Sequence, residues 1–223
     1  MEILKTLRHE FKYVIPYGDM LKLRTELEKV LTLDRNGSYI VRSLYFDTVD
    51  DADYYAKQNG DIKRRKIRLR IYDIDSDFAK LEIKSKYDIH QLKESLVIKK
   101  SDALEIIKGN YDCLLLMDND LAQRLYVYLR SGYRPKVIIE YDRIAYITTT
   151  TTRITFDYNI KKSDEFENFY TNNINYFDLT NPNDVVLEVK FDHFLEPYIG
   201  KILEKYVSRY QSVSKYVMGR NVE

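Results

Sequence analysis

The chain has 223 residues, of which 44% are hydrophobic and 32% are charged, so it can bury a core and is not disordered. Its formal net charge is +1, from 36 Lys and Arg against 35 Asp and Glu. This balance excludes a uniformly basic nucleic-acid-binding protein but permits a focused basic site. We therefore expect no nucleic-acid partner.

The sequence also constrains the compartment. No segment approaches the roughly 20 apolar residues of a membrane span. The start, Met1 to Lys5, lacks the apolar core of a signal peptide. The single cysteine, Cys113, allows no intrachain disulfide and sits in an apolar run. We expect a cytoplasmic protein without a membrane span of its own, which leaves room for a separate membrane partner.

Alternation of charged and apolar residues predicts eight strands. They cover about residues 6–15, 39–47, 62–73, 78–87, 90–99, 135–147, 151–160 and 184–192. Asn36-Gly37 and Asn59-Gly60 are turn signals between them. The very short connections between the third, fourth and fifth segments indicate antiparallel hairpins.

Helical spacing of apolar residues fills the longer gaps. The expected helices cover residues 17–32, 51–58, about 101–108, 119–131 and 198–207. Asp19 is the expected N-cap of the first, and Ser101 or Asp102 that of the third. Residues 161–183 are polar and predict a loop. No internal boundary or repeat is evident, so we expect one domain over residues 1–223.

The charged faces of the strands decide the fold class. Lys66, Arg68 and Arg70 share one strand face, opposite Ile67 and Leu69. The same alternation recurs in the other strands, as in Arg8, Glu10 and Lys12; Lys80, Glu82, Lys84 and Lys86; Arg153, Thr155 and Asp157; and Glu188, Lys190 and Asp192. One such face is typical of a solvated surface, whereas five favour a polar interior. We expect an α+β fold, a closed eight-stranded antiparallel β-barrel flanked by α-helices; the alternative is an open sheet with a solvated face.

Two Glu-x-Lys pairs, Glu10-Phe11-Lys12 and Glu188-Val189-Lys190, place a carboxylate and an ammonium on one strand face. The carboxylate can hold a hard divalent ion whose shell phosphate oxygens complete, while the lysine contacts the phosphate. An ordinary surface ion pair is the alternative.

Arginine forks suit phosphate oxygens, and Arg68 and Arg70 offer two of them side by side. Four further strands add Lys84, Lys93, Arg143 and Arg153. Burying even one unpaired cation costs several kcal/mol. We therefore expect a ligand with several negative charges, such as polyphosphate or a nucleoside triphosphate.

Two regions leave alternatives open. Ser214 either begins a helix that meets phosphate together with Lys215, or caps an ordinary helix. In the sixth strand, Val137 and Ile139 share the face of Arg143, which implies an apolar floor or a bulge. The sequence contains no Walker loop, Gly-x-Gly-x-x-Gly, Cys-x-x-Cys or Gly-x-Ser-x-Gly motif.

These motifs together resemble the triphosphate tunnel metalloenzyme superfamily and, within it, the polyphosphate polymerase domain of the vacuolar transporter chaperone (VTC) type. The stretches that carry the resemblance are Arg8 to Tyr13, Ser43 to Thr48, Lys66 to Tyr72, Leu81 to Lys84, Glu140 to Tyr146, Arg153 to Asp157, Val186 to Phe191 and Ser214 to Tyr216. They follow one another in order across nearly the whole chain.

The resemblance implies an eight-stranded tunnel and assigns roles to residues. Phosphates would be held by Lys12, Tyr45, Arg68, Arg70, Lys84, Lys93, Arg143, Arg153, Lys190, Ser214 and Lys215. A divalent metal, Mn²⁺ or Mg²⁺, would be held by Glu188 and Glu10. The helix that carries Lys215 would shield one tunnel mouth.

One departure separates the activities within the superfamily. Triphosphate hydrolases of the superfamily typically begin with Glu-x-Glu-x-Lys, whereas this chain has Arg8 at the first position. Fewer carboxylates favour transfer to a phosphate chain over hydrolysis. Our hypothesis is a phosphotransferase that moves the terminal phosphoryl group of ATP onto inorganic polyphosphate, with Arg68, Arg70, Arg143, Arg153 and Lys12 as catalytic residues. The alternatives are a metal-dependent triphosphatase and a non-catalytic polyphosphate-binding module.

Overall fold

The computed structural model describes residues 8–88, 90–148 and 151–221, and for Arg8 only the backbone. The strands in this part are β1 (Arg8–Pro16), β2 (Thr32–Thr48), β3 (Lys63–Ile71), β4 (Phe78–Tyr87), β5 (His90–Lys99), β6 (Tyr133–Ile147), β7 (Arg153–Ser163), β8 (Phe177–Asp178) and β9 (Asp184–Asp192). The helices are α1 (Tyr17–Leu27), α2 (Ala52–Gln58), α3 (Lys100–Ile107), α4 (Asp120–Arg130), α5 (Pro197–Leu203) and α6 (Lys215–Asn221). None of these helices is long and apolar enough to cross a membrane.

The strands form one sheet in the order β1-β9-β7-β6-β2-β3-β4-β5, and the two-residue strand β8 pairs with β7. The pairs β1–β9, β2–β3, β3–β4, β4–β5, β7–β8 and β7–β9 are antiparallel, and β3, β4 and β5 form two consecutive hairpins. The expected α+β fold with eight long antiparallel strands is therefore confirmed. The order is a path with two ends, β1 and β5, and not a ring, so the closed barrel is not confirmed.

Several expected boundaries are wrong for local reasons. Strand β2 starts at Thr32 and continues through the expected turn, because Gly37 adopts a φ of 58° inside the strand. Helix α1 follows Pro16 directly, so Asp19 lies in its first turn and is not the N-cap. Helix α3 begins at Lys100, before both expected caps. The expected loop over residues 161–183 contains the end of β7 and all of β8.

Other expectations about local structure hold. In α4 the Asn119 side chain accepts hydrogen bonds from the backbone N–H groups of Leu121 and Ala122, which caps the helix where the sequence indicated its start. Between β6 and β7, the N–H of Thr148 donates to the carbonyl of Thr152 at 3.0 Å. Residues 149 and 150 lie outside the described part.

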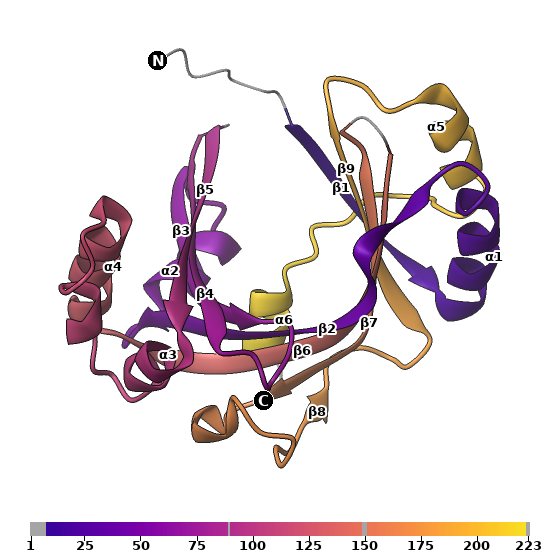
Figure 1. Cartoon of the computed structure of the whole chain (residues 1–223). Helices are drawn as coiled ribbons and strands as arrows, with labels where there is room; N and C mark the ends of the chain where they lie inside the picture. The colour runs from indigo at the N-terminus through magenta and orange to yellow at the C-terminus, as the bar shows by residue number, and fades with distance from the viewer. Residues whose placement is uncertain (1–7, 89, 149–150, 222–223) are drawn as a thin grey trace. The chain divides into compact units, whose positions relative to one another are not determined.

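The chain divides into two compact units, which we describe separately. Unit 1 comprises residues up to Ile40, Tyr141–Ile160 and Thr180–Ser214. Figure 1 shows its helices α1 and α5 beside each other against β1 and β9. The core consists of apolar strand residues and helix residues, among them Ile15, Leu187 and Val189 with Met20, Leu23, Leu27, Ile199 and Leu203. Burying this face leaves the alternate, charged residues of the same strands on the opposite face.

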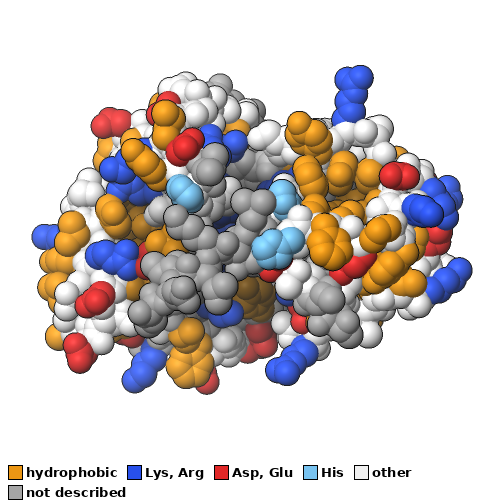
Figure 2. Space-filling view, turned by 90° about the horizontal axis from the view of Figure 1, so that it is seen from above, with side chains coloured by type: hydrophobic (Ala, Val, Ile, Leu, Met, Phe, Trp, Pro, Cys, Tyr) orange, Lys and Arg blue, Asp and Glu red, His pale blue; other side chains and the backbone are white. Residues whose placement is uncertain are grey.

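An aromatic group extends the apolar face of unit 1 beyond its helices. The ring of Phe11 contacts those of His9, Phe191 and Tyr210, with centroid separations of 6.4, 5.8 and 5.9 Å. Figure 2 shows hydrophobic and histidine side chains close together on this part of the surface. These aromatic residues therefore belong to the apolar face and not to the charged one.

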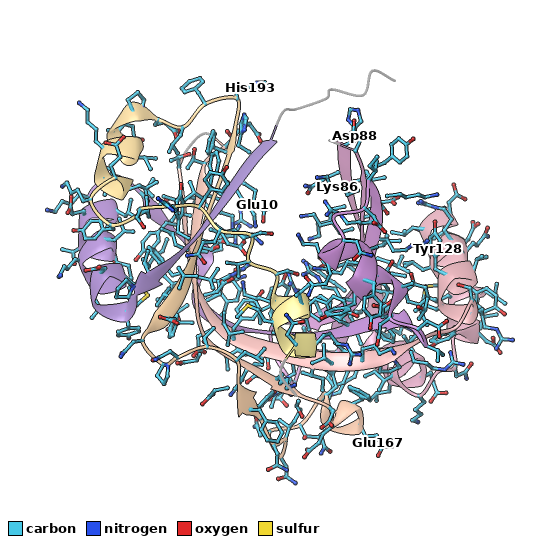
Figure 3. All side chains as sticks on the ribbon, turned by 180° about the vertical axis from the view of Figure 1, so that it is seen from behind. Glu10, Lys86, Asp88, Tyr128, Glu167 and His193 are labelled. Atoms are coloured by element: carbon cyan, nitrogen blue, oxygen red, sulfur yellow. The ribbon has the colours of Figure 1, made fainter. Side chains whose placement is uncertain are left out.

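Unit 2 comprises Val41–Glu140, Lys161–Leu179 and the residues from Lys215 onward. Its core packs the apolar residues of β3 and β4 against α3 and α4, and it includes Ile67, Leu69, Leu81, Ile83, Ile106, Leu125 and Leu129. Tyr128 of α4, labelled in Figure 3, lies 4.7 Å from the guanidinium of Arg65 at the edge of this core. Both units consist of non-contiguous segments, so the single domain over residues 1–223 stays a prediction.

Candidate functional site

The face of unit 2 opposite α3 and α4 is built from charged residues in register on neighbouring strands. The cross-strand rows are Ser43, Arg70 and Lys80; Tyr45, Arg68, Glu82 and Ser95; and Lys66, Lys84 and Lys93. We call these residues the cationic face. The antiparallel register brings together four strands whose residues lie up to 52 positions apart in the chain, from Ser43 to Ser95.

Glu82 lies at the middle of the cationic face with only 3% of its side chain exposed. Its Oε2 accepts a hydrogen bond from Arg68 Nε at 2.6 Å and lies 3.8 Å from Arg70 Nη1. Its Oε1 is 2.6 Å from Lys93 Nζ. Burial would raise the pKa of Glu82, but the charges of Arg68 and Arg70 and the hydrogen bond from Lys93 lower it to about 2. Glu82 is therefore ionised at neutral pH.

Tyr45 lies beside Glu82 in the same row. Its hydroxyl accepts a hydrogen bond from Arg68 Nη1 at 3.3 Å, and Lys66 Nζ is 5.8 Å from its ring centroid. Burial would raise the pKa of the phenol, but the charges of Arg68, Lys66 and Arg70 lower it to about 7. The phenol of Tyr45 thus lies among several positive charges of the face.

Helix α6 packs beside the cationic face, on β2 and β6. The ring of Tyr216 stacks on Tyr45 with centroids 5.2 Å apart, and its hydroxyl donates a hydrogen bond to Asp47. A Cβ on Gly219 would collide with the side chains of Ile139 and Val137. The glycine thus allows the helix to lie directly on β6. The apolar stretch of the sixth strand is therefore the surface on which α6 packs, and no bulge is needed to explain it. Lys215, the first residue of α6, is buried.

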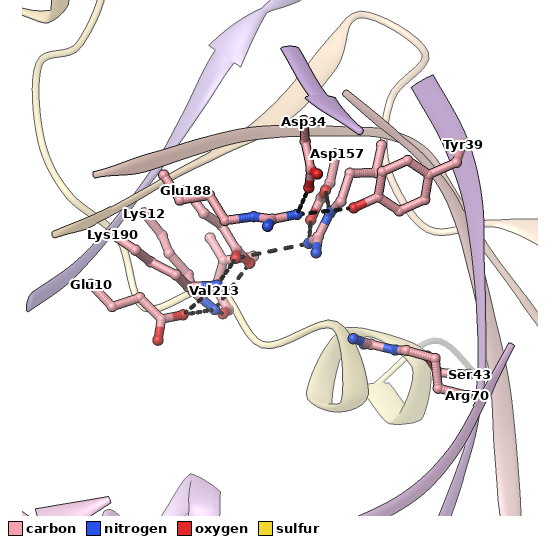
Figure 4. A network of polar contacts seen from close by, with 12 residues as sticks. Glu10, Lys12, Asp34, Tyr39, Ser43, Arg70, Asp157, Glu188, Lys190 and Val213 are labelled. Carbon is pink, nitrogen blue, oxygen red and sulfur yellow. Dashed lines mark hydrogen bonds and ion pairs between the residues drawn. The ribbon is translucent and has the colours of Figure 1, made fainter. Parts of the chain in front are cut away.

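The charged face of unit 1 has a different composition (Figure 4). The register pairs Glu10 with Lys190 and Lys12 with Glu188 across β1 and β9. Lys12 Nζ lies 3.2 Å from Glu10 Oε1 and 3.3 Å from Glu188 Oε1. Lys190 Nζ lies 2.8 Å from Glu188 Oε2 and 3.8 Å from Glu10 Oε1. The two Glu-x-Lys pairs therefore form one ring of four alternating charges.

Two arginines extend this ring. Arg143 of β6 donates two hydrogen bonds to Asp157 of β7, at 2.6 and 2.7 Å, and its Nη2 is 3.9 Å from Glu188 Oε2. Burial would lower the pKa of Arg143, but Tyr141, Asp157 and Glu188 raise it well above its usual range. The guanidinium of Arg143 is thus fully charged and fixed by a carboxylate.

Arg153 of β7 is held by the N-terminal half of β2. Its Nη2 is 2.6 Å from Asp34 Oδ2 and 3.2 Å from the hydroxyl of Tyr39. This contact exists only because β2 begins at Thr32, well before the predicted start. Asp34 therefore carried no recognisable signal in the sequence.

The segment before Ser214 lies along β1. The backbone N–H of Gln211 donates to the carbonyl of Lys12 at 2.7 Å, and Lys12 Nζ donates to the carbonyl of Val213 at 3.2 Å. Ser214 is thus the last residue of a strap that reaches the charged ring of unit 1.

The charged ring can contribute ligands to a divalent metal but cannot enclose one. Among the described residues, no group of three or more His, Cys, Asp or Glu side chains is placed to hold a metal ion. Glu10 and Glu188 supply two carboxylates, and hard cations such as Mg²⁺ are commonly bound by one or two carboxylates together with substrate phosphates and water. The residues present therefore fit a metal that a phosphate ligand brings with it.

The structure distributes the predicted site residues between the two units. Unit 2 holds Tyr45, Arg68, Arg70, Lys84, Lys93 and Lys215, and unit 1 holds Glu10, Lys12, Arg143, Arg153, Glu188, Lys190 and Ser214. Sequence reasoning missed the acidic partners Glu82, Asp157 and Asp34. For the first two a signal existed, since each alternates with cations of the same strand. These carboxylates lie among the cations and compensate part of their charge without a ligand.

Comparisons with known proteins agree with this architecture. The family profile described as the VTC domain matches residues 7–222. A search of curated proteins found no significant match. Among solved structures, a proposed adenylate cyclase from Bacillus halodurans is similar, with a TM-score of 0.52, 13% identity and coverage of 88% of this chain and 85% of that chain. A proposed adenylate cyclase from Vibrio parahaemolyticus gives 0.51 and 12%, with coverage of 96% and 97%. At these identities the two structures show a shared fold.

Proposed function

Because the chain belongs to the VTC domain family, we propose that it is a polyphosphate polymerase that transfers the terminal phosphoryl group of ATP to a growing inorganic polyphosphate chain. The observation that carries the proposal is the cationic face, where Arg68, Arg70 and Lys93 all converge on a single carboxylate. A polyanion with evenly spaced charges is the ligand that suits such a face.

Unit 2 is proposed to bind the phosphate chain. Arg68 and Arg70 present forked donors that suit the oxygens of one phosphoryl group. Lys84 and Lys93 follow on the next two strands in one row with Lys66 and supply point charges for neighbouring phosphates. Tyr45, which stacks on Tyr216 of α6, and Lys215, the first residue of α6, are proposed as further phosphate contacts.

Unit 1 is proposed to bind the phosphates that carry a metal. Glu188 and Glu10 would hold Mn²⁺ or Mg²⁺, which when bound supplies charge stabilisation to the phosphate oxygens. Lys12 and Lys190 lie within 4 Å of these carboxylates and would contact the phosphates. Arg143 and Arg153 would neutralise charge on the transferring group, and Ser214 would add a hydroxyl contact.

The proposed step balances without a general base. An ionised terminal oxygen of the acceptor chain attacks the γ-phosphorus of ATP and forms the new P–O bond. The bond between this phosphorus and the bridging oxygen breaks, and its electron pair leaves with ADP. The protein contributes position and positive charge, which are the main sources of catalysis in phosphoryl transfer.

A metal-dependent triphosphatase is the second candidate, since the closeness of Glu10 and Glu188 in the charged ring also suits hydrolysis of a metal-bound triphosphate. A binding module without turnover is the third. The closed barrel, the single domain and the cytoplasmic location expected from the sequence stay predictions within this proposal, as do ATP and polyphosphate as partners.

Incubation of the purified protein with ATP and Mn²⁺ tests the proposal, with ADP, free phosphate and polyphosphate measured in one sample. The proposal expects ADP together with a polymer ladder and little free phosphate. Free phosphate without polymer would establish the hydrolase instead, and tight polyphosphate binding without either product would establish the binding module.

A further inference from the structure

Glu82 is a buried carboxylate to which the proposed phosphate transfer assigns no role. Its side chain is buried among cations and opposite Arg68 on β3 and Ser95 on β5. Three cations contact its two oxygens. Arg68 Nε and Lys93 Nζ each lie 2.6 Å from a carboxylate oxygen, and Arg70 Nη1 lies 3.8 Å from one. Two of them, Arg68 and Arg70, are the residues that suit phosphate oxygens best.

A phosphate group at Arg68 and Arg70 would have to share these donors with the carboxylate. Arg68 uses its Nε for Glu82, and Arg70 donates its own Nε to Ser43 Oγ at 3.0 Å. A fixed negative charge beside a bound phosphate also repels it, and this repulsion is strong where water is excluded. In the ligand-free structure Glu82 carries this negative charge, because Arg68, Arg70 and Lys93 lower its pKa to about 2.

We propose that Glu82 is a built-in competing anion, which occupies Arg68, Arg70 and Lys93 in the absence of ligand and limits the affinity of the cationic face for a phosphate chain. This inference rests on the proposed function. A face with many cations and no acid would hold a long polyanion too tightly to release it or let it advance. With Glu82 present, each phosphate group that binds these cations replaces the Glu82 carboxylate, and the carboxylate replaces the phosphate group when it leaves.

Glu94 provides a matched comparison on the same hairpin. It lies on β5 in register with Ile83, on the opposite face, and forms two contacts with Arg124 of α4, at 2.5 and 3.1 Å. It thus has the same side chain and a similarly short ion pair, but among the described residues its ion-pair partner is Arg124 of α4 and not a member of the cationic face. Removing its charge changes the net charge of the protein as much as removing that of Glu82.

The test measures binding of inorganic tripolyphosphate and of a long-chain polyphosphate, without metal, to the wild type, Glu82→Gln and Glu94→Gln. We expect Glu82→Gln to bind about tenfold more tightly, whereas Glu94→Gln binds like the wild type; tenfold corresponds to about 1.4 kcal/mol. In the ATP assay, the KM for polyphosphate and the turnover number should both fall, because product leaves slowly.

Weaker or unchanged binding by folded Glu82→Gln would overturn the inference and make Glu82 a residue that orients Arg68. If Glu82→Gln does not fold, Glu82→Asp keeps the charge but withdraws it from the cations, and it should bind more tightly than the wild type; equal or weaker binding overturns the inference as well. Absence of polyphosphate binding by the wild type would reject the proposed function together with this inference, whereas the previous outcomes leave that function intact.

Discussion

The charged faces of the two units differ in their balance of charge. In unit 1, each cation has acidic neighbours; Lys12, Lys190, Arg143 and Arg153 face Glu10, Glu188, Asp157 and Asp34. In unit 2, Arg68, Arg70 and Lys93 share Glu82, while Lys66 and Lys84 lie in the next row. One face is therefore close to neutral, and the other carries an excess of positive charge.

This difference indicates how one protein can bind both a metal-bound phosphate and a bare phosphate chain. A metal-bound phosphate needs carboxylates for the metal as well as cations for its oxygens, which a balanced face supplies. A bare phosphate chain needs an excess of cations, because it brings its own negative charge. The first three predictions below test this division of labour, and the fourth concerns the stability of unit 2.

The largest effect is expected from Arg70→Ala in the cationic face. Arg70 is buried and its Nε donates to Ser43 Oγ. The variant loses a forked, charge-assisted donor to the phosphate chain, so polymer synthesis should fall roughly 100-fold. Product gels measure this loss, with Arg124→Ala on α4 as a variant that removes an equal charge from the other face. Full retained synthesis in folded Arg70→Ala would refute the role of the cationic face.

Glu188→Gln should separate the two faces. It removes the better buried carboxylate of the charged ring, so metal-dependent synthesis should fall roughly tenfold to 100-fold. Metal-free binding of polyphosphate, attributed to unit 2, should change less than about threefold. Titration with Mn²⁺ and calorimetric binding without metal give the two values.

Glu26→Gln is the control for this prediction, because Glu26 belongs to α1 and pairs with Lys205 and Tyr206, outside the charged ring. A Glu188→Gln protein that loses metal-free polyphosphate binding as strongly as synthesis would remove the distinction between the two faces.

The salt dependence of metal-free binding should reveal which cations contact the chain. Each lysine that neutralises a phosphate releases about one counter-ion, so Lys84→Gln and Lys93→Gln should each lower the slope of log affinity against log salt by about one. Lys190→Gln should leave the slope unchanged, because its ammonium lies between Glu188 and Glu10. Equal slopes for all three variants would contradict the assignment of metal-free phosphate binding to the cationic face.

The smallest effect concerns the stability of unit 2. Asp53 accepts a hydrogen bond from the hydroxyl of Tyr133 at 2.7 Å, and burial raises its pKa from 3.8 to about 6. The folded state therefore binds more protons than the unfolded state between these values, and stability falls as pH rises from about 4 to 6.

Asp53→Asn should remove this pH dependence. We expect the variant to gain about 2 kcal/mol in the free energy of unfolding at pH 7.5 and almost nothing at pH 4. Denaturant titrations at the two pH values measure both changes. A gain of the same size at pH 4 would show that the titration of Asp53 is not its cause.

Much of the fold was predictable because alternation is a local property. In β3, the sequence Ile67-Arg68-Leu69-Arg70 assigns the two aliphatic residues to the core and the two arginines to the opposite face, and the structure agrees. The charged ring that joins Glu10 to Lys190 depends on the pairing of β1 with β9. The alternation of residues within one strand does not predict which strand it pairs with. The family resemblance indicated that these charged residues belong to the site, but it did not indicate which residues they pair with.

The sequence by itself determined roughly where eight long strands lie and which face of each strand is charged, since a period of two depends only on neighbouring residues. It also determined that arginine forks and Glu-x-Lys pairs are present. Tertiary structure alone decided how these charges are compensated. Asp34 reaches Arg153 across 119 positions in the chain, and Glu82 reaches cations from two neighbouring strands. Such pairing depends on strand register, and register is set by the packing of the apolar faces against the helices.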